Sequence, residues 1–280
     1  MPIMKNIKMD WQEIYLEVDN NGYIINPKSD LINGKIRLKI KGEYEEIKIG
    51  GYFLSGCSGL YELDLGGLQN VTTIGDSFLG GCSGLKKIDL IGLQNVTSIG
   101  NYFLSCCRGL KELELDLSGL QNVTIIGHSF LYDCTVLKKL DLSGLQNVTT
   151  IANDFLSGCN GLKELDLSGL QNVTSIGNYF LSRCYGLNEL DLSGLQKVTT
   201  IENSFVYGCK GLTELDLSGL QNVTSIGNYF LYDCSGLELI RCKGKIKEII
   251  KDKYLNLYDK IEVEVENVNI EINDSIKVEI

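Results

Sequence analysis

Apolar residues recur along most of the chain in a pattern that repeats about every 25 residues. In the copy that begins at Leu162, the motif L-x-x-L-x-L continues through Leu165 and Leu167. Apolar and polar residues alternate in the second half of this motif, which predicts a short strand whose leucines point into a core. Three apolar residues at spacing three follow and predict a tightly turning arc over that core: Leu170, Val173 and Ile176.

Each copy ends with a phenylalanine and a cysteine four residues apart, as at Phe180 and Cys184. A single helical turn would place both side chains on one face, so we expect both to be buried. Glycines such as Gly169 and Gly186 follow the same period, and we interpret them as turn residues. All eight phenylalanines of the chain keep this period, and so do eight cysteines: Cys57, Cys82, Cys107, Cys134, Cys159, Cys184, Cys209 and Cys234.

The periodicity itself predicts the fold. One such unit cannot bury its apolar face alone, whereas neighbouring copies can close one another's core. We therefore predict an α/β repeat solenoid over residues 38–244, with about eight 25-residue repeats and one parallel strand in each. A strand followed by a short helical segment is the pattern of a leucine-rich-repeat right-handed superhelix.

The repeat also resembles a particular family. The motif L-x-x-L-x-L, the apolar arc and then Ile176-Gly177, Phe180 and Cys184 are similar to the BspA-like (Treponema-type) leucine-rich repeats, over about residues 38–244. This resemblance implies a curved solenoid with a binding or adhesion role, often exposed at the cell surface.

The two ends of the chain depart from the repeat. Residues 11–37 alternate apolar and polar residues around Asn21-Gly22 and Asn33-Gly34, which predicts a β-rich cap over residues 1–37 with Trp11 closing the core. Residues 245–280 predict a charged amphipathic helix followed by a small β-meander as the C-terminal cap. Two extra residues between Leu110 and Leu117 predict a bulge at one strand entry, after which the register resumes.

Charge and hydropathy exclude several classes of protein. The 280-residue chain has a net charge of -10, which disfavours nucleic acid and anionic membranes as partners. No run of 18 apolar residues occurs, so membrane insertion is not expected. The N-terminal segment lacks the apolar core of a signal peptide, and the chain has ten cysteines. These features favour an intracellular location, while the family resemblance allows the cell surface.

The repeated cysteines are poorly arranged for chemistry. A zinc site needs four ligands that converge on one point, whereas these cysteines follow one another along a line. We interpret them as a structural ladder of buried thiols. The single histidine, His128, occupies a position that is asparagine in sister repeats. We therefore predict no catalytic residue, no metal and no cofactor.

Six repeats contain the sequence Asn-Val-Thr, which is also an N-glycosylation signal. Lys197 replaces the asparagine in a seventh repeat, so the amide is dispensable there. We favour a structural role at a turn and keep glycosylation as the alternative. The asparagines are Asn70, Asn95, Asn122, Asn147, Asn172 and Asn222.

Outward positions of the predicted strands carry a column of acids on the side expected to be concave. Stacked at about 5 Å, these carboxylates repel one another and would attract a basic partner. We expect this column to set the electrostatics of binding. Its members are Asp64, Asp89, Asp116, Asp141, Asp166, Asp191 and Asp216, with Glu164, Glu189 and Glu214 beside them.

A second surface varies between copies, around each cysteine. Tyr132, Arg183, Tyr185 and Tyr207 stand there, and tyrosine and arginine are common anchors of protein interfaces. The sequence thus predicts a non-catalytic scaffold that binds a protein partner, with a basic one favoured by the acid column. The alternatives are an exported glycosylated adhesin and an enzyme whose site lies in a cap.

Overall fold

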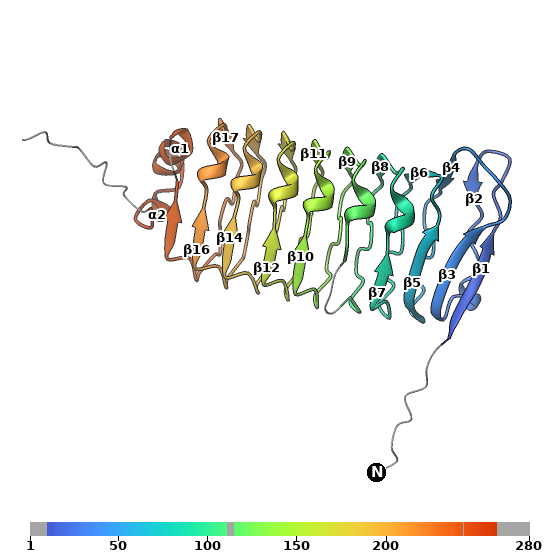
Figure 1. Cartoon of the computed structure of the whole chain (residues 1–280). Coiled ribbons are helices and arrows are strands. Elements are labelled where there is room, and N and C mark those ends of the chain that lie inside the picture. Colours follow the sequence, from blue (N-terminus) through green and yellow to red (C-terminus); the bar gives the residue numbers. More distant parts are fainter. Residues whose placement is uncertain (1–9, 111–114, 243, 262–280) are drawn as a thin grey trace, which may run out of the picture.

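The computed structural model describes residues 10–110, 115–242 and 244–261. Figure 1 shows an elongated stack in which each repeat forms one rung of a parallel β-solenoid, with β1 at one end and α2 at the other. The predicted leucine-rich-repeat solenoid is confirmed, with little helix: single 3-10 turns within the rungs and two short α-helices at the C-terminal end.

The strands predicted from the L-x-L motif form one side of the stack. They pair in parallel within three groups of neighbouring rungs, for example Leu140 with Leu165. The members are β1 (Trp11–Leu16), β3 (Gly34–Ile40), β5 (Leu60–Gly67), β7 (Lys87–Asp89), β10 (Lys139–Asp141), β12 (Glu164–Asp166), β14 (Glu189–Asp191), β16 (Glu214–Asp216) and β18 (Leu239–Arg241).

A second strand lies in each rung where the sequence pattern predicts only a turning arc. These short strands pair in parallel to form one continuous nine-stranded sheet. They are β2 (Tyr23–Ile24), β4 (Ile47–Ile49), β6 (Val71–Ile74), β8 (Ser98–Ile99), β9 (Ile125–Ile126), β11 (Thr150–Ile151), β13 (Ser175–Ile176), β15 (Thr200–Ile201) and β17 (Ser225–Ile226).

Single 3-10 turns connect the two strands in most rungs. Six of them begin directly after the inward leucine that follows the first strand, so that the chain leaves the first sheet at once, whereas the turn at Ser29–Leu31 follows Lys28 and leads into β3. The 3-10 turns are η1 (Ser29–Leu31), η2 (Ile91–Leu93), η3 (Ser118–Leu120), η4 (Ser143–Leu145), η5 (Ser168–Leu170), η6 (Ser193–Leu195) and η7 (Ser218–Leu220).

The core is one continuous cluster that runs along the stack. Its centre is a column of eight fully buried phenylalanines whose rings stack from rung to rung. Phe130 and Phe155 lie with ring centroids 5.4 Å apart and planes at 7°. Adjacent rings therefore bury each other, which is why a single repeat could not fold alone.

The segment that leads from the second strand to the cysteine is not helical. Phe180 and Cys184 are both buried, as predicted, but the helical turn that motivated this prediction is wrong. Tyr179, Leu181 and Arg183 have φ angles of 60°, 54° and 59°, a left-handed region that residues other than glycine rarely adopt.

Alternating left-handed residues turn the backbone amides along the stack axis. The Tyr179 N–H donates to the Asn203 carbonyl in the next rung at 3.0 Å. The Leu181 N–H donates in the opposite direction, to the Phe155 carbonyl at 3.0 Å. These bonds form a third ladder between rungs, which offsets the backbone strain of the left-handed residues.

The periodic glycines have a different role from the predicted one. Gly169 and Gly186 do not have left-handed φ angles. A Cβ atom on Gly169 would lie 1.9 Å from the Leu142 carbonyl oxygen of the preceding rung, and one on Gly186 would lie 2.6 Å from that of Leu162. Glycine is required at these positions because the rungs approach closely, not because the chain turns.

The N-terminal segment continues the stack. β1 pairs in parallel with β3, and β2 pairs in parallel with β4, so residue 38 marks where the repeat consensus begins rather than where the stack begins. The predicted turn at Asn21-Gly22 is present beside an isolated antiparallel bridge between Val18 and Ile24. Asn33-Gly34 is not the turn of an antiparallel hairpin, because β3, which begins at Gly34, pairs in parallel with β1.

Trp11 does not close the core, contrary to the prediction. Its side chain is 40% exposed on the outer side of β1, and the guanidinium of Arg37 lies over its ring at 5.1 Å. Smaller aliphatic side chains, among them Leu16, Ile24 and Ile36, are buried at this end instead. In a parallel rung the outward strand position belongs to the polar face, whatever residue occupies it.

The predicted C-terminal helix is present as α1 (Lys245–Lys253), followed by α2 (Leu255–Tyr258). Ile246 and Ile250 are buried against the last rung, where the Tyr254 ring packs 5.6 Å from that of Phe230. The predicted β-meander, apart from Ile261, lies outside the described residues. So does the predicted bulge at residues 111–114, after which the common register has returned by η3.

Candidate interaction surfaces

The first candidate surface is the strand face, formed by the outward side chains of the strands β1, β3, β5, β7, β10, β12, β14, β16 and β18. The predicted aspartates stack there in register, as Asp141 with Asp166 and Asp191 with Asp216. Of the seven, Asp64 and Asp216 are half-buried and the other five are exposed. Glu164, Glu189 and Glu214 line the same face and are exposed.

The aspartates also have a local structural role that the sequence analysis missed. In each described repeat, the aspartate Oδ1 accepts a hydrogen bond from the backbone N–H two residues later, as from Ser168 to Asp166 at 2.8 Å. This bond lowers the pKa of Asp166 and fixes the start of the 3-10 turn. An asparagine could accept the same bond, whereas an alanine could not.

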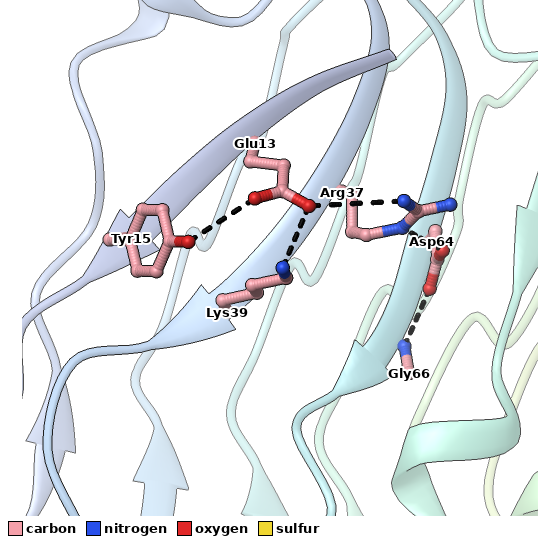
Figure 2. Close-up of polar contacts among 6 residues, drawn as sticks. All are labelled: Glu13, Tyr15, Arg37, Lys39, Asp64 and Gly66. Carbon is pink, nitrogen blue, oxygen red and sulfur yellow. Dashed lines mark hydrogen bonds and ion pairs between the residues drawn. The ribbon is translucent and has the colours of Figure 1, made fainter.

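The N-terminal end of the strand face is neutralised by ion pairs, shown in Figure 2. The Arg37 Nε lies 2.6 Å from Asp64, and the Lys39 ammonium lies 2.7 Å from Glu13. The hydrogen bond from Lys39 lowers the pKa of Glu13, and the bond to Asp64 raises the pKa of Arg37. Asp64 is therefore compensated and is not a free binding charge.

The opposite end of the strand face also carries a cation. Arg241 of β18 stands beside Asp216 in the register, and it forms an ion pair with Glu214 at 2.9 Å. Between the two ends, Lys139 pairs with Glu164 at 2.8 Å and lowers the pKa of that glutamate. Among the described residues, no cation forms an ion pair with the five aspartates from Asp89 to Asp191.

The second candidate surface is a groove on the edge of the stack, which we call the tyrosine groove. It has a volume of about 720 Å³ and contains all four residues predicted for the variable edge, Tyr132, Arg183, Tyr185 and Tyr207. Its full lining is Tyr132, Asp133, Asp154, Ser157, Gly158, Asn160, Tyr179, Ser182, Arg183, Tyr185, Ser204, Tyr207, Tyr229 and Tyr232.

The shape of the groove follows from the stacking register. Ser157 and Ser182 occupy the column that holds Tyr132 on one side and Tyr207 on the other, so two consecutive rungs lack a ring there. Both serines are buried. Tyr132 and Tyr207 are three rung steps apart, which is about 15 Å at strand spacing. Small residues therefore form the floor and tyrosines form the walls.

Ring contacts organise one end of the groove. Tyr207 and Tyr232 are stacked with centroids 5.8 Å apart, and Tyr229 meets Tyr232 edge-on at 5.7 Å. The guanidinium of Arg183 lies over the Tyr207 ring at 6.0 Å. These contacts hold large side chains in place before any partner binds, which reduces the entropy lost on binding.

The lining residues Asp154, Tyr179 and Tyr229 were not predicted from the sequence. The residue before each phenylalanine is tyrosine in four repeats, serine in three and aspartate in one. Tyrosine at a position where serine also fits the fold was a signal, readable in the sequence, that these rings could serve binding. Which of these rings gather in one groove depends on register and becomes visible only in the structure.

The eight predicted ladder cysteines are buried free thiols in consecutive rungs. Each thiol from Cys82 onwards donates to a backbone carbonyl of the preceding rung, as Cys159 does to Leu131 at 3.2 Å. Burial raises the pKa of Cys82 to about 12 and that of Cys234 to about 11. Neutral thiols in an apolar column do not provide the thiolates that metal binding requires.

Cys106 is the one half-buried cysteine, and we expect it alone to react quickly with a thiol reagent. At pH 7.5, dithionitrobenzoate should modify about one thiol per chain at first, because the other nine cysteines are buried. Cys106→Gly should abolish this fast phase, since Gly158 and Gly208 occupy the same backbone position in sister repeats. Fast modification of several thiols in the folded protein would contradict the buried ladder.

The asparagines of the Asn-Val-Thr motifs link neighbouring rungs. Asn147 donates from its Nδ2 to the Gln121 carbonyl of the preceding rung at 2.8 Å, and Asn172 donates likewise to Gln146. His128 belongs to a separate polar ladder, in which its Nδ1 accepts the Asn153 N–H at 3.1 Å. Both observations give these residues a structural role.

The described part of the chain contains neither a metal-binding cluster nor a membrane-spanning helix. Within residues 10–110, 115–242 and 244–261, no group of three or more His, Cys, Asp or Glu side chains is placed to hold a metal ion. Among the same residues, no helix is long and apolar enough to cross a bilayer.

Comparison with known proteins gives a family and a fold. The model of the BspA type leucine rich repeat region (6 copies) matches residues 38–163 and 164–276. No curated relative matches the sequence.

Solved structures similar to this chain include leucine-rich repeat proteins of T. pallidum and Bacteroides ovatus. The first is 17% identical over 88% of this chain and 94% of its own, with a TM-score of 0.44. The second is 19% identical over 80% and 66%, with a TM-score of 0.48. A leucine rich cell surface protein of Faecalibacterium prausnitzii is 16% identical over 76% and 79%, with a TM-score of 0.23.

Proposed function

Since the chain belongs to the BspA-type leucine-rich-repeat family, we propose that it is a non-catalytic scaffold that binds a partner protein through the tyrosine groove. The matching family is defined by its leucine-rich repeat, and its description indicates no enzymatic activity. A rigid stack held by three hydrogen-bond ladders presents side chains from several rungs as one fixed surface.

The composition of the groove is the observation that carries this proposal. Six of its fourteen lining residues are tyrosine, and the others are Ser, Asn, Asp, Gly and Arg. Five of the tyrosines are between 38% and 59% exposed, so the core does not need them. Tyrosine with serine, glycine and asparagine is the composition of protein-binding loops in antibodies, and tyrosine and arginine dominate interface hot spots.

The strand face is the second candidate surface, and its contribution is electrostatic. The five aspartates from Asp89 to Asp191, which form no ion pair within the described residues, would create a negative field that speeds the encounter with a basic partner at low salt. We propose that this field steers the partner, while the tyrosine groove supplies the affinity.

Two alternatives receive less support. A glycan on an Asn-Val-Thr motif would occupy the Nδ2 atom that already binds the preceding rung, as in Asn147. The ten free cysteines suit a reducing compartment, so we propose that the scaffold works inside the cell. An enzymatic role has no metal-binding cluster to support it in the described part of the chain.

The test compares three variants of the full chain in cross-linking and affinity capture from the source cells. The groove variant is Tyr179→Ser, Tyr207→Ser and Tyr232→Ser, because serine occupies the same columns in sister repeats. Its matched control is Tyr52→Ser with Tyr102→Ser, which removes exposed rings outside the groove. The strand-face variant is Asp141→Asn, Asp166→Asn and Asp191→Asn.

We expect the groove variant to bind the captured partner at least about tenfold more weakly, with the control unchanged. The strand-face variant should keep its stability, since asparagine can accept the same backbone bond, and should lose most of the salt dependence of the association rate. Equal capture by the groove variant and its control would contradict the proposed groove. Unchanged salt dependence would remove the steering role of the aspartates.

A further inference from the structure

Asp154 is the one acid in a column that otherwise contains tyrosine and serine. Its sister residues include Ser129, Tyr179 and Ser204, with φ angles of 59–60° against 61° for Asp154, so the left-handed backbone does not require aspartate there. The side chain is half-buried at the wall of the tyrosine groove. Packing and backbone geometry therefore leave this carboxylate unexplained.

The Asp154 carboxylate also lacks a counter-ion. Within the described residues, no hydrogen bond or ion pair reaches it, and burial raises its pKa, opposed only by the nearby His128. The neighbouring acid Asp133 is different, because Arg108 binds it from the preceding rung. A partly desolvated carboxylate without a partner is costly in the free protein and is relieved when a cation binds.

Tyrosines line the same groove as Asp154. Tyr132 and Tyr179 line the same groove, above a floor that includes Ser157 and Gly158. The one cation inside the groove, Arg183, already lies over Tyr207 at the other end of the gap. The half of the groove at Asp154 therefore combines open space, exposed rings and uncompensated negative charge.

The chain itself shows how such a site is filled. Arg37 lies 5.1 Å over the Trp11 ring on the strand face while its Nε contacts Asp64. In this arrangement one guanidinium stacks on an aromatic ring and pairs with a carboxylate at the same time. A planar guanidinium suits it better than an ammonium, because it can stack on a ring and donate at its edge.

We propose that the half of the tyrosine groove around Asp154 binds an arginine side chain of the partner protein, stacked on the Tyr132 and Tyr179 rings and paired with Asp154. This inference rests on the proposed function and names the chemistry of the partner. It predicts that the captured partner contacts the groove with an arginine-containing segment.

The direct test uses a small probe and does not need the partner. N-acetyl-arginine methylamide is titrated into the full chain carrying isotope-labelled tyrosine rings, with ring signals followed by NMR. The neutral isostere N-acetyl-citrulline methylamide is the matched ligand control. Asp154→Asn and Asp154→Ser are the test variants, and Asp233→Asn is the matched protein control, because Asp233 already pairs with Lys210 outside the lining of the groove.

We expect saturable shifts of the Tyr132 and Tyr179 signals with the arginine probe. The affinity should fall at least about tenfold in both Asp154 variants and with citrulline, since a hydrogen bond to a charged group is lost. Asp233→Asn should change nothing. Asp154→Ser has the residue of sister repeats, so its thermal unfolding should match that of the parent.

Two results would overturn the arginine site: equal binding of citrulline, or full binding to the Asp154 variants. If the groove variant loses the partner while the arginine probe does not bind, the scaffold proposal stands and the arginine site is wrong. If the control with Tyr52→Ser and Tyr102→Ser loses the partner equally, the groove itself is wrong.

Discussion

Raising the pH from 7 to 9.5 in reducing buffer is expected to lower the free energy of unfolding by about 11 kcal/mol. Burial raises the pKa of the ladder thiols, to about 12 for Cys82 and well above the ordinary value for Cys159 and Cys184. In the unfolded chain the same thiols lose their protons above about pH 8.5. The unfolded state therefore binds fewer protons, and stability falls as the pH rises.

The size of this effect comes from the number of thiols in the ladder. Their contribution is complete below the unfolded pKa of about 8.5 and is lost progressively towards the folded pKa. Each of the eight thiols costs about 1.4 kcal/mol per pH unit within that window, which brings the total to about 11 kcal/mol one unit above the unfolded pKa, at pH 9.5. Urea titrations at each pH, followed by circular dichroism, measure it.

The matched variant for this prediction is Cys159→Ala with Cys184→Ala. It lacks two of the eight thiols, so the difference in unfolding free energy between pH 7 and pH 9.5 should shrink by about a quarter, whatever the variant costs at pH 7. An unfolding free energy that stays level up to pH 9.5 would show that the thiols are not held protonated in the folded state.

The parts of the fold in which every repeat has the same residue at the same position were predictable from the sequence. Phe130 and Phe155 fall one period apart, and a ring column can only be buried by stacking. The second strand was not predictable, because Thr150 and Ile151 are too short a run to alternate visibly. Their extended conformation is imposed by hydrogen bonds to the rungs on either side.

The left-handed residues are a second feature that the sequence could not predict. Local preference opposes a positive φ at Leu181, and no sequence rule would assign it. The ladder of amides between rungs fixes it, so the cause is non-local. The candidate site also has a part that was predictable and a part that was not. The sequence identified Tyr132, Arg183, Tyr185 and Tyr207 as departures from the repeat. Asp154 became a candidate only when the structure showed that no described residue pairs with its carboxylate.

Gly169→Ala is expected to lower the free energy of unfolding by about 3 kcal/mol or more. An added Cβ would lie 1.9 Å from the Leu142 carbonyl oxygen and 2.6 Å from its carbonyl carbon, both backbone atoms of the preceding rung. Neither atom can move alone, because the same rung is held by its strands, its 3-10 turn and the phenylalanine column. The two rungs would have to separate, and this would weaken the contacts between them along the stack. Chemical denaturation of the two proteins at pH 7 measures the difference.

Gly158→Ala is the matched control, because it separates close approach from backbone conformation. Gly158 has a φ of 79°, yet the nearest atom to an added Cβ lies 3.4 Å away, and Arg183 and Asp133 occupy the same position in sister repeats. We expect a loss of about 1 kcal/mol there, from backbone strain alone. If Gly158→Ala cost as much as Gly169→Ala, the periodic glycines would be turn residues after all, as the sequence pattern predicts. A much larger loss at Gly169 would show that glycine is there because adjacent backbones nearly touch.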